Sequence, residues 1–190
     1  MQHKKVRLYI KLILIILCFI VAIHIFILTL SRYQSDSESE ADIDIAFYLL
    51  KEDYKSMTLN LGKIVPRSEP YVYTFEITNE ENGQIAETDL EYSLELRTTT
   101  NLPLKYKLYK NENYLDSNAT NIITSENNEQ DEDGTYFKII TTDSEELKHS
   151  QAISNIYTLV VNFPQEYNTE EYQDIIDVVE INVESKQIID

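Results

Sequence analysis

Residues Tyr71–Thr78 read Y-V-Y-T-F-E-I-T, and this stretch decides the fold class. Every second residue has a large apolar or aromatic side chain. Because successive side chains of a β-strand point to opposite faces, this alternation is typical of an antiparallel strand with one face buried and the other in water. The stretch therefore predicts a half-buried strand whose buried face consists of Tyr71, Tyr73, Phe75 and Ile77.

The same period of two recurs along the chain on both sides of this stretch. About eight short strands at such spacing, separated by turns, are typical of an antiparallel two-sheet sandwich. The sequence therefore predicts an all-β, jelly-roll-like sandwich. The further predicted strands are Ala41–Leu50, Met57–Leu61, Asp89–Thr98, Leu104–Lys110, Tyr136–Thr141, Ile156–Phe163 and Val178–Glu184.

Three connections between these strands have recognisable signals. Glu81-Asn82-Gly83 is a turn signal, and Asn111–Asp133 is a long polar insertion. Thr169–Ile176 is a short helix candidate, because Thr169 suits an N-cap and acidic residues follow in the first turn. We expect the four prolines to lie at strand edges or in connections, where a missing N–H does no harm.

An uncharged apolar run, Leu12–Leu30, precedes all of these strands. As a helix it would extend about 28 Å, close to the thickness of a bilayer core. Basic residues cluster before the run, and positive flanks stay in the cytoplasm. The sequence therefore predicts a cytoplasmic tail (residues 1–11), one transmembrane helix (12–30), a flexible stalk (31–40) and an extracellular domain (41–190).

The alternative is that the run is a cleaved signal peptide. Thr29 and Ser31 would then occupy the positions before the cut, although the run is longer than the usual apolar region of a signal peptide. Permanent anchoring is the interpretation we retain. Cleavage would release the domain into the extracellular matrix.

The charge of the chain limits its partners. The formal net charge is −17, and all 33 acidic residues follow Arg32. Nucleic-acid binding requires basic patches, so this class of partner is not expected. The chain has one Cys, so no disulfide stabilises the extracellular domain, and its stability must come from packing. We expect protein partners or self-association.

The sequence contains few residues that suggest catalysis. His149 is the only histidine of the predicted domain, and no H-E-x-x-H pattern or nucleophile elbow accompanies it. A surface hydrolase would need His149, or paired carboxylates, to converge in a cleft. We therefore expect a protein that is not an enzyme and has no cofactor.

Glu129–Gly134, E-Q-D-E-D-G, is similar to the start of a calcium-binding loop. An EF-hand requires an acidic residue six positions after the glycine, and Ile140 stands there, so the match fails. An irregular calcium site formed by Glu129, Asp131 and Asp133 is the alternative to a solvated loop.

Several segments together resemble the TasA/camelysin group of secreted bacterial biofilm-matrix and surface proteins. The similarity covers strand order and turns over most of the predicted domain, and it includes no signature motif. The matching pieces are Ala46-Phe47, Gly62–Pro66, Tyr73–Asn79, Leu102-Pro103, Tyr157–Leu159, Phe163-Pro164 and Ile181–Gln187.

The resemblance implies a jelly-roll-like sandwich and fibres in which an N-terminal segment of one subunit completes a sheet of the next. The donor side chains would be Ile43, Ile45, Phe47 and Leu49. Our first hypothesis is a membrane-anchored, cell-surface or biofilm-matrix structural protein that works by protein contact. The second is an extracellular accessory or sensor domain that binds a partner membrane protein or a small ligand.

Overall fold

The computed structural model describes residues 45–61, 64–169, 172 and 177–189. The predicted tail, transmembrane helix and stalk, and residues 41–44 of the predicted domain, lie outside these residues. Among the described residues, no helix is long and apolar enough to cross a bilayer. The described part is mostly β-structure, as the alternation predicted.

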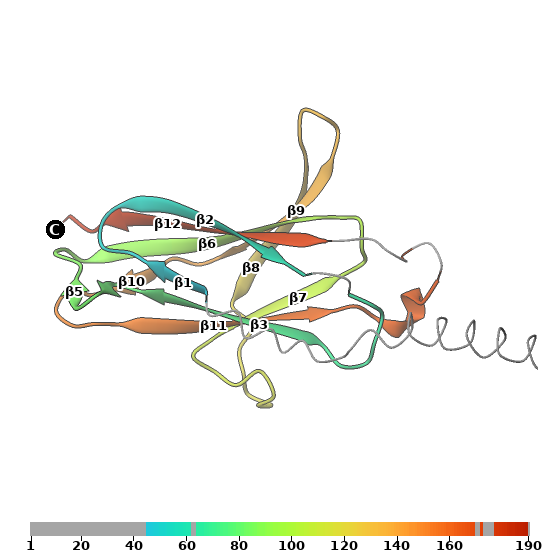
Figure 1. Ribbon diagram of the computed structural model, residues 1–190, viewed down its shortest axis with the longest axis horizontal. Helices are drawn as coiled ribbons and strands as arrows, with labels where there is room; N and C mark the ends of the chain where they lie inside the picture. Colours follow the sequence, from blue (N-terminus) through green and yellow to red (C-terminus); the bar gives the residue numbers. More distant parts are fainter. Residues whose placement is uncertain (1–44, 62–63, 170–171, 173–176, 190) are drawn as a thin grey trace, which may run out of the picture. The chain divides into compact units, whose positions relative to one another are not determined.

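The first sheet has four strands in the order β1-β3-β11-β7 (Figure 1). β3 and β11 form its centre, and they pair antiparallel over eight positions from Ser154↔Thr78 to Val161↔Tyr71. β1 and β7 form its two edges. The bounds are β1 (Ile45–Tyr48), β3 (Tyr71–Thr78), β7 (Lys105–Lys110) and β11 (Ser154–Asn162).

The second sheet has six strands, with the path β2-β12-β6-β9-β8 and β10 added on β6. Its longest pairing joins β12 to β6. The bounds are β2 (Asp53–Asn60), β6 (Leu90–Thr99), β8 (Ile123–Gln130), β9 (Tyr136–Thr142), β10 (Glu145–Leu147) and β12 (Val178–Gln187).

One hydrophobic core receives side chains from both sheets. The predicted buried faces are confirmed: Tyr71, Tyr73, Phe75 and Ile77 of β3 are at most 5% exposed. Strands β6, β11 and β12 follow the same rule, because alternate side chains reach the core. The buried sets are Leu90, Tyr92, Leu94 and Leu96 of β6, Tyr157, Leu159 and Val161 of β11, and Val179, Ile181 and Val183 of β12.

The turn predicted at Glu81-Asn82-Gly83 is confirmed. β4 (Glu80–Glu81) and β5 (Gln84–Ile85) form a small hairpin around it. Asn82 and Gly83 both have positive φ, 52° and 80°, which Asn and Gly adopt more readily than other residues.

Two features differ from the sequence expectation. β1 pairs with β3 in parallel, so the sheets are not wholly antiparallel. The reason is that β2, in the other sheet, separates β1 from β3, so no hairpin imposes opposite directions. In addition, β8 lies within the segment predicted to be a polar insertion. It pairs with β9 through its backbone, but most of its side chains are exposed, so it leaves no apolar alternation in the sequence.

The chain after β11 contains a short 3₁₀ helix, η1 (Gln165–Tyr167), that the sequence did not predict. The predicted helix Thr169–Ile176 lies mostly outside the described residues. Between residues 169 and 177 the structure describes Thr169, Tyr172 and Asp177. The ring of Tyr172 contacts Phe163 and Tyr167 edge-on.

Candidate interaction surface

The two edges of the four-stranded sheet, β1 and β7, are the first candidates for contacts with other proteins. An edge strand presents backbone N–H and C=O groups that another chain can pair with. β1 is four residues long and has no partner strand beyond it among the described residues. β7 is six residues long and lies at the opposite edge.

β1 lies within its own domain, in register with β3 from Ile45↔Phe75 to Tyr48↔Thr78. Its pairing continues for one residue, because the Leu49 N–H donates to the Thr78 carbonyl at 2.8 Å. Of the four candidate donor residues, Ile43 lies outside the described residues, and only the backbone of Ile45 is described. Phe47 and Leu49 are buried in the core of their own domain, at 2% and 0% exposure.

A chain of aromatic contacts joins β1 to the opposite sheet. The ring of Phe47 lies edge-on to Phe75 with centroids 6.0 Å apart, and Phe75 stacks on Tyr157 at 5.1 Å. The Tyr157 hydroxyl is hydrogen-bonded to the Tyr92 hydroxyl, on β6, at 2.6 Å. The core position of β1 is therefore connected to the bond that links the two sheets.

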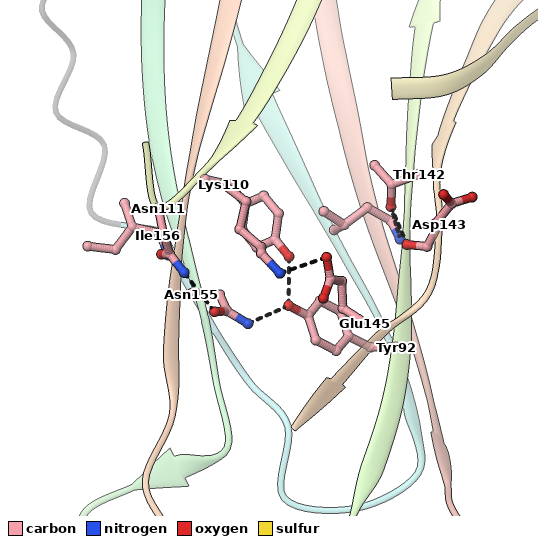
Figure 2. A network of polar contacts seen from close by, with 10 residues as sticks. Tyr92, Lys110, Asn111, Thr142, Asp143, Glu145, Asn155 and Ile156 are labelled. Atoms are coloured by element: carbon pink, nitrogen blue, oxygen red, sulfur yellow. Dashed lines mark hydrogen bonds and ion pairs between the residues drawn. The ribbon is translucent and has the colours of Figure 1, made fainter. Parts of the chain in front are cut away.

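A polar network surrounds this inter-sheet bond (Figure 2). Asn155 Nδ2 donates to the Tyr92 hydroxyl at 2.8 Å, and Asn111 Nδ2 donates to Asn155 Oδ1 at 2.9 Å. Burial raises the pKa of Tyr92 to about 12, so its hydroxyl stays protonated at neutral pH. Nearby, Lys110 Nζ and Glu145 Oε1 form an ion pair at 2.6 Å between β7 and β10.

The other edge, β7, is covered at one end by the loop that follows it. The Leu108 N–H donates to Asn121 Oδ1 at 2.9 Å, and the Ile122 N–H donates to the Leu108 carbonyl at 2.9 Å. The Lys105 and Lys107 side chains are exposed on the outer face of the strand. Lysines on an edge strand oppose pairing with another chain.

A shallow groove of about 400 Å³ lies beside β7. Its basic side chains are Arg67, Lys105 and Lys107. In the sequence, the one signal for these residues is the alternation K-Y-K in Lys105–Lys107 within a strongly acidic domain, and it did not predict a groove. The remaining lining residues are Ser68, Tyr106, Asn162, Pro164 and Gln165, so none of the described residues that line the groove is a carboxylate.

The core side of β7 is linked to the other sheet through a buried acid. The Tyr106 hydroxyl is hydrogen-bonded to Thr98 Oγ1 at 3.1 Å, and both Thr98 and Thr99 donate to Asp177 Oδ1. Asp177 is 1% exposed, and its Oδ2 has no hydrogen-bond partner within the described part of the chain. Burial raises the pKa of Asp177, because the charged form loses its hydration.

The acidic calcium candidates lie at the tip of the hairpin formed by β8 and β9. Glu129 is on β8, and Asp131 and Asp133 lie in the turn. Asp131 Oδ1 accepts the N–H groups of Asp133 at 3.1 Å and Thr135 at 2.9 Å, so this carboxylate stabilises the turn. Over residues 45–61, 64–169, 172 and 177–189, no three or more His, Cys, Asp or Glu residues form a group that could hold a metal ion.

His149 lies at the surface beside Asp89. Its Nδ1 is 2.6 Å from Asp89 Oδ1, and its backbone N–H donates to the same oxygen at 2.8 Å. Lys148 Nζ contacts the other carboxylate oxygen at 3.1 Å. These hydrogen bonds, those from His149 first, lower the pKa of Asp89 to about 2. The pair fastens the loop after β10 to the start of β6.

Comparisons with known proteins add no family to this description. No protein-family model matches the chain, and no curated protein matches it.

Proposed function

We propose that the protein is a non-enzymatic cell-surface or matrix protein that works by contact with other proteins, including its own copies. Residues 12–30 would anchor it in the membrane, with the N-terminus in the cytoplasm and the sandwich outside. The observation that carries this proposal is the position of β1. It is a short edge strand, it is the first strand of the described domain, and it places Phe47 in the core.

A strand in this position is suited to exchange between copies. If β1 of one copy takes the place of β1 on β3 of another, every contact of Phe47 and Leu49 is re-formed with identical residues. Exchange of an identical element is a low-cost route to assembly, because the contacts are conserved and no new surface is needed. The arrangement of two sheets around one core and the resemblance to the TasA/camelysin group support the same proposal.

The test uses cysteines at Ala46 and Glu76, which face each other in the β1–β3 register. Adjacent strands place paired Cα atoms about 5 Å apart, within the range of a disulfide. One copy carries Ala46→Cys, another carries Glu76→Cys, and both carry Cys18→Ser to remove the only native thiol. After co-expression and oxidation of the full chains, we expect a disulfide-linked dimer.

Val72→Cys supplies the matched control. Val72 lies on the same strand as Glu76 and on the same outer face, but β1 does not reach it. The proposal fails if Ala46→Cys forms dimers no more readily with Glu76→Cys than with Val72→Cys.

The membrane anchor is tested separately by the mass of the mature N-terminus from the native host. A chain that begins near Met1 indicates an anchored surface domain. A chain that begins between about Ser31 and Asp42 shows that the run is a cleaved signal peptide. That result contradicts the anchor and leaves a secreted matrix protein with a free β1.

A further inference from the structure

We propose that the groove beside β7 binds the acidic tip of the β8–β9 hairpin of a second copy of this chain. This proposal rests on the proposed function, because it supplies a second contact between copies. The groove presents Arg67, Lys105 and Lys107, and the tip (Glu129–Asp133) presents Glu129, Asp131, Glu132 and Asp133.

The groove holds positive charge that no carboxylate of the described residues pairs with. Within the described residues, Arg67, Lys105 and Lys107 form no ion pair, whereas most other basic side chains do. The basic residues that do form ion pairs are Lys55, Arg97, Lys110, Lys138, Lys148 and Lys186. In a chain with a net charge of −17, unpaired cations at one groove are where an acidic surface can approach.

Arg67 is also held in place by its own neighbours. Its Nε donates to the Glu69 carbonyl and its Nη2 to the Pro70 carbonyl, both at 2.9 Å, and the guanidinium lies over the Tyr71 ring. The pKa of the neighbouring Glu69 is lowered, first by a hydrogen bond from the Ser68 side chain and last by the charge of Arg67. A fixed charge loses little conformational entropy when a partner binds.

The tip of the β8–β9 hairpin projects from the domain and is ordered. The hairpin of β8 and β9 extends away from the rest of its sheet (Figure 1). Asp131 and the Gly134 backbone hold the turn through hydrogen bonds, and Glu129, Glu132 and Asp133 are exposed. The tip is therefore an ordered, acidic projection that meets a partner without first having to fold.

The contact joins two different surfaces of the molecule, the tip on one copy and the groove on the next. Such a heterologous contact repeats from copy to copy and produces rings or open chains. Because the contact depends on charges near the surface, its strength should fall as the salt concentration rises.

The test combines zero-length cross-linking with charge reversal in the full-length chain in detergent. Copies labelled with ¹⁴N and ¹⁵N are mixed and treated with a carbodiimide, which joins lysines to carboxylates in contact. We expect hybrid peptides that link Lys105 or Lys107 to Glu132 or Asp133. The groove variant Lys105→Glu/Lys107→Glu and the tip variant Glu132→Lys/Asp133→Lys should each reduce self-association at least about tenfold in sedimentation velocity.

The decisive arm mixes the two reversed variants. The reversed groove then faces a reversed tip, so the mixture should regain association that neither variant has alone. Lys51→Glu/Lys186→Glu, at two exposed positions outside the groove lining, changes the net charge by the same amount and should have little effect. The proposal is overturned if this control weakens association as much, or if the mixture is not restored.

Three further outcomes distinguish this proposal from its premise and from another ligand of the groove. If the β1–β3 disulfide dimer forms but the groove variants associate normally, the groove contact is wrong and the proposed function stands. If copies form neither contact, both are wrong. If the groove variants lose binding to inorganic polyphosphate while association is unchanged, the groove binds another anion and the proposal is overturned.

Discussion

The two edge strands of the four-stranded sheet, β1 and β7, both have backbone groups that another chain could pair with. They differ in how far these groups are protected. β7 carries exposed lysines, and a loop hydrogen-bonds to Leu108 at one end. β1 has neither feature: it is short, runs parallel to β3 and depends on Phe47 and Leu49 in the core. The β7 edge is protected by charge and by a covering loop. Among the described residues, the β1 edge has no such protection and is held only by its contacts with its own domain.

The links of these edges to the opposite sheet also differ. From β1, Phe47 leads through Phe75 to a Tyr157–Tyr92 bond whose hydroxyls both have partners. From β7, Tyr106 leads through Thr98 to Asp177, which has one oxygen without a partner among the described residues. The side chains of β1 are therefore held mainly by apolar packing, whereas the contacts of β7 with the other sheet include a buried titratable group, Asp177.

The largest effect is expected at β1 itself. Phe47→Ala removes a buried ring and leaves a cavity, so it should lower the free energy of unfolding by about 3–5 kcal/mol. The measurement is urea unfolding of the full-length chain in detergent, followed by the emission of its 14 tyrosines. Tyr48→Ala, at a 39% exposed position on the same strand, is the control. Equal losses for the two variants would show that β1 is not anchored by its core face.

Tyr157→Phe tests the link between β1 and the six-stranded sheet. It keeps the ring stacked on Phe75 but removes the hydroxyl that bonds Tyr92, so a buried polar group loses one partner. We expect a loss of about 1–3 kcal/mol in the same unfolding experiment. Tyr54→Phe, at a residue that is 61% exposed, should change stability little. A neutral Tyr157→Phe would mean that the inter-sheet bond contributes nothing.

Asn121→Ala tests the cover of β7. It removes the acceptor of the Leu108 N–H, a part-buried hydrogen bond, and we expect a loss of about 1 kcal/mol, the usual net contribution of one hydrogen bond. Hydrogen exchange should show faster exchange of the Leu108 amide in the variant. Unchanged exchange at Leu108 would indicate that the loop does not protect this edge.

The smallest effect is the pH dependence that Asp177 adds on the β7 side. Its pKa is raised above the ordinary value of 3.8, so its contribution to stability is fully present below 3.8 and is lost as pH rises through the folded pKa. Asp177→Asn should flatten this loss when unfolding is measured from pH 4 upward. Asp89, with a pKa of about 2, loses its contribution below that range and does not interfere. A variant with the same pH profile as the native chain would contradict the assignment.

The strands with one buried face were predictable from the sequence, because burial imposes the period-two alternation of Tyr71–Ile77 and Leu90–Leu96. β8 was not, since its strand is stabilised by backbone pairing with β9 and its polar side chains carry no alternation. The parallel direction of β1 depends on the path of the chain through β2, which composition does not encode. The groove was missed because Arg67 and the lysines of β7 are far apart in sequence and meet only after folding.

Native-state hydrogen exchange of β1 is the direct test of strand exchange between copies, because exchange requires that β1 separates from its domain while the rest stays folded. On the full-length chain, we expect the Leu49 amide and those of β1 to open at a free energy well below that of the β3–β11 amides. β1 amides that exchange only with global unfolding, as slowly as those of β11, would contradict the account.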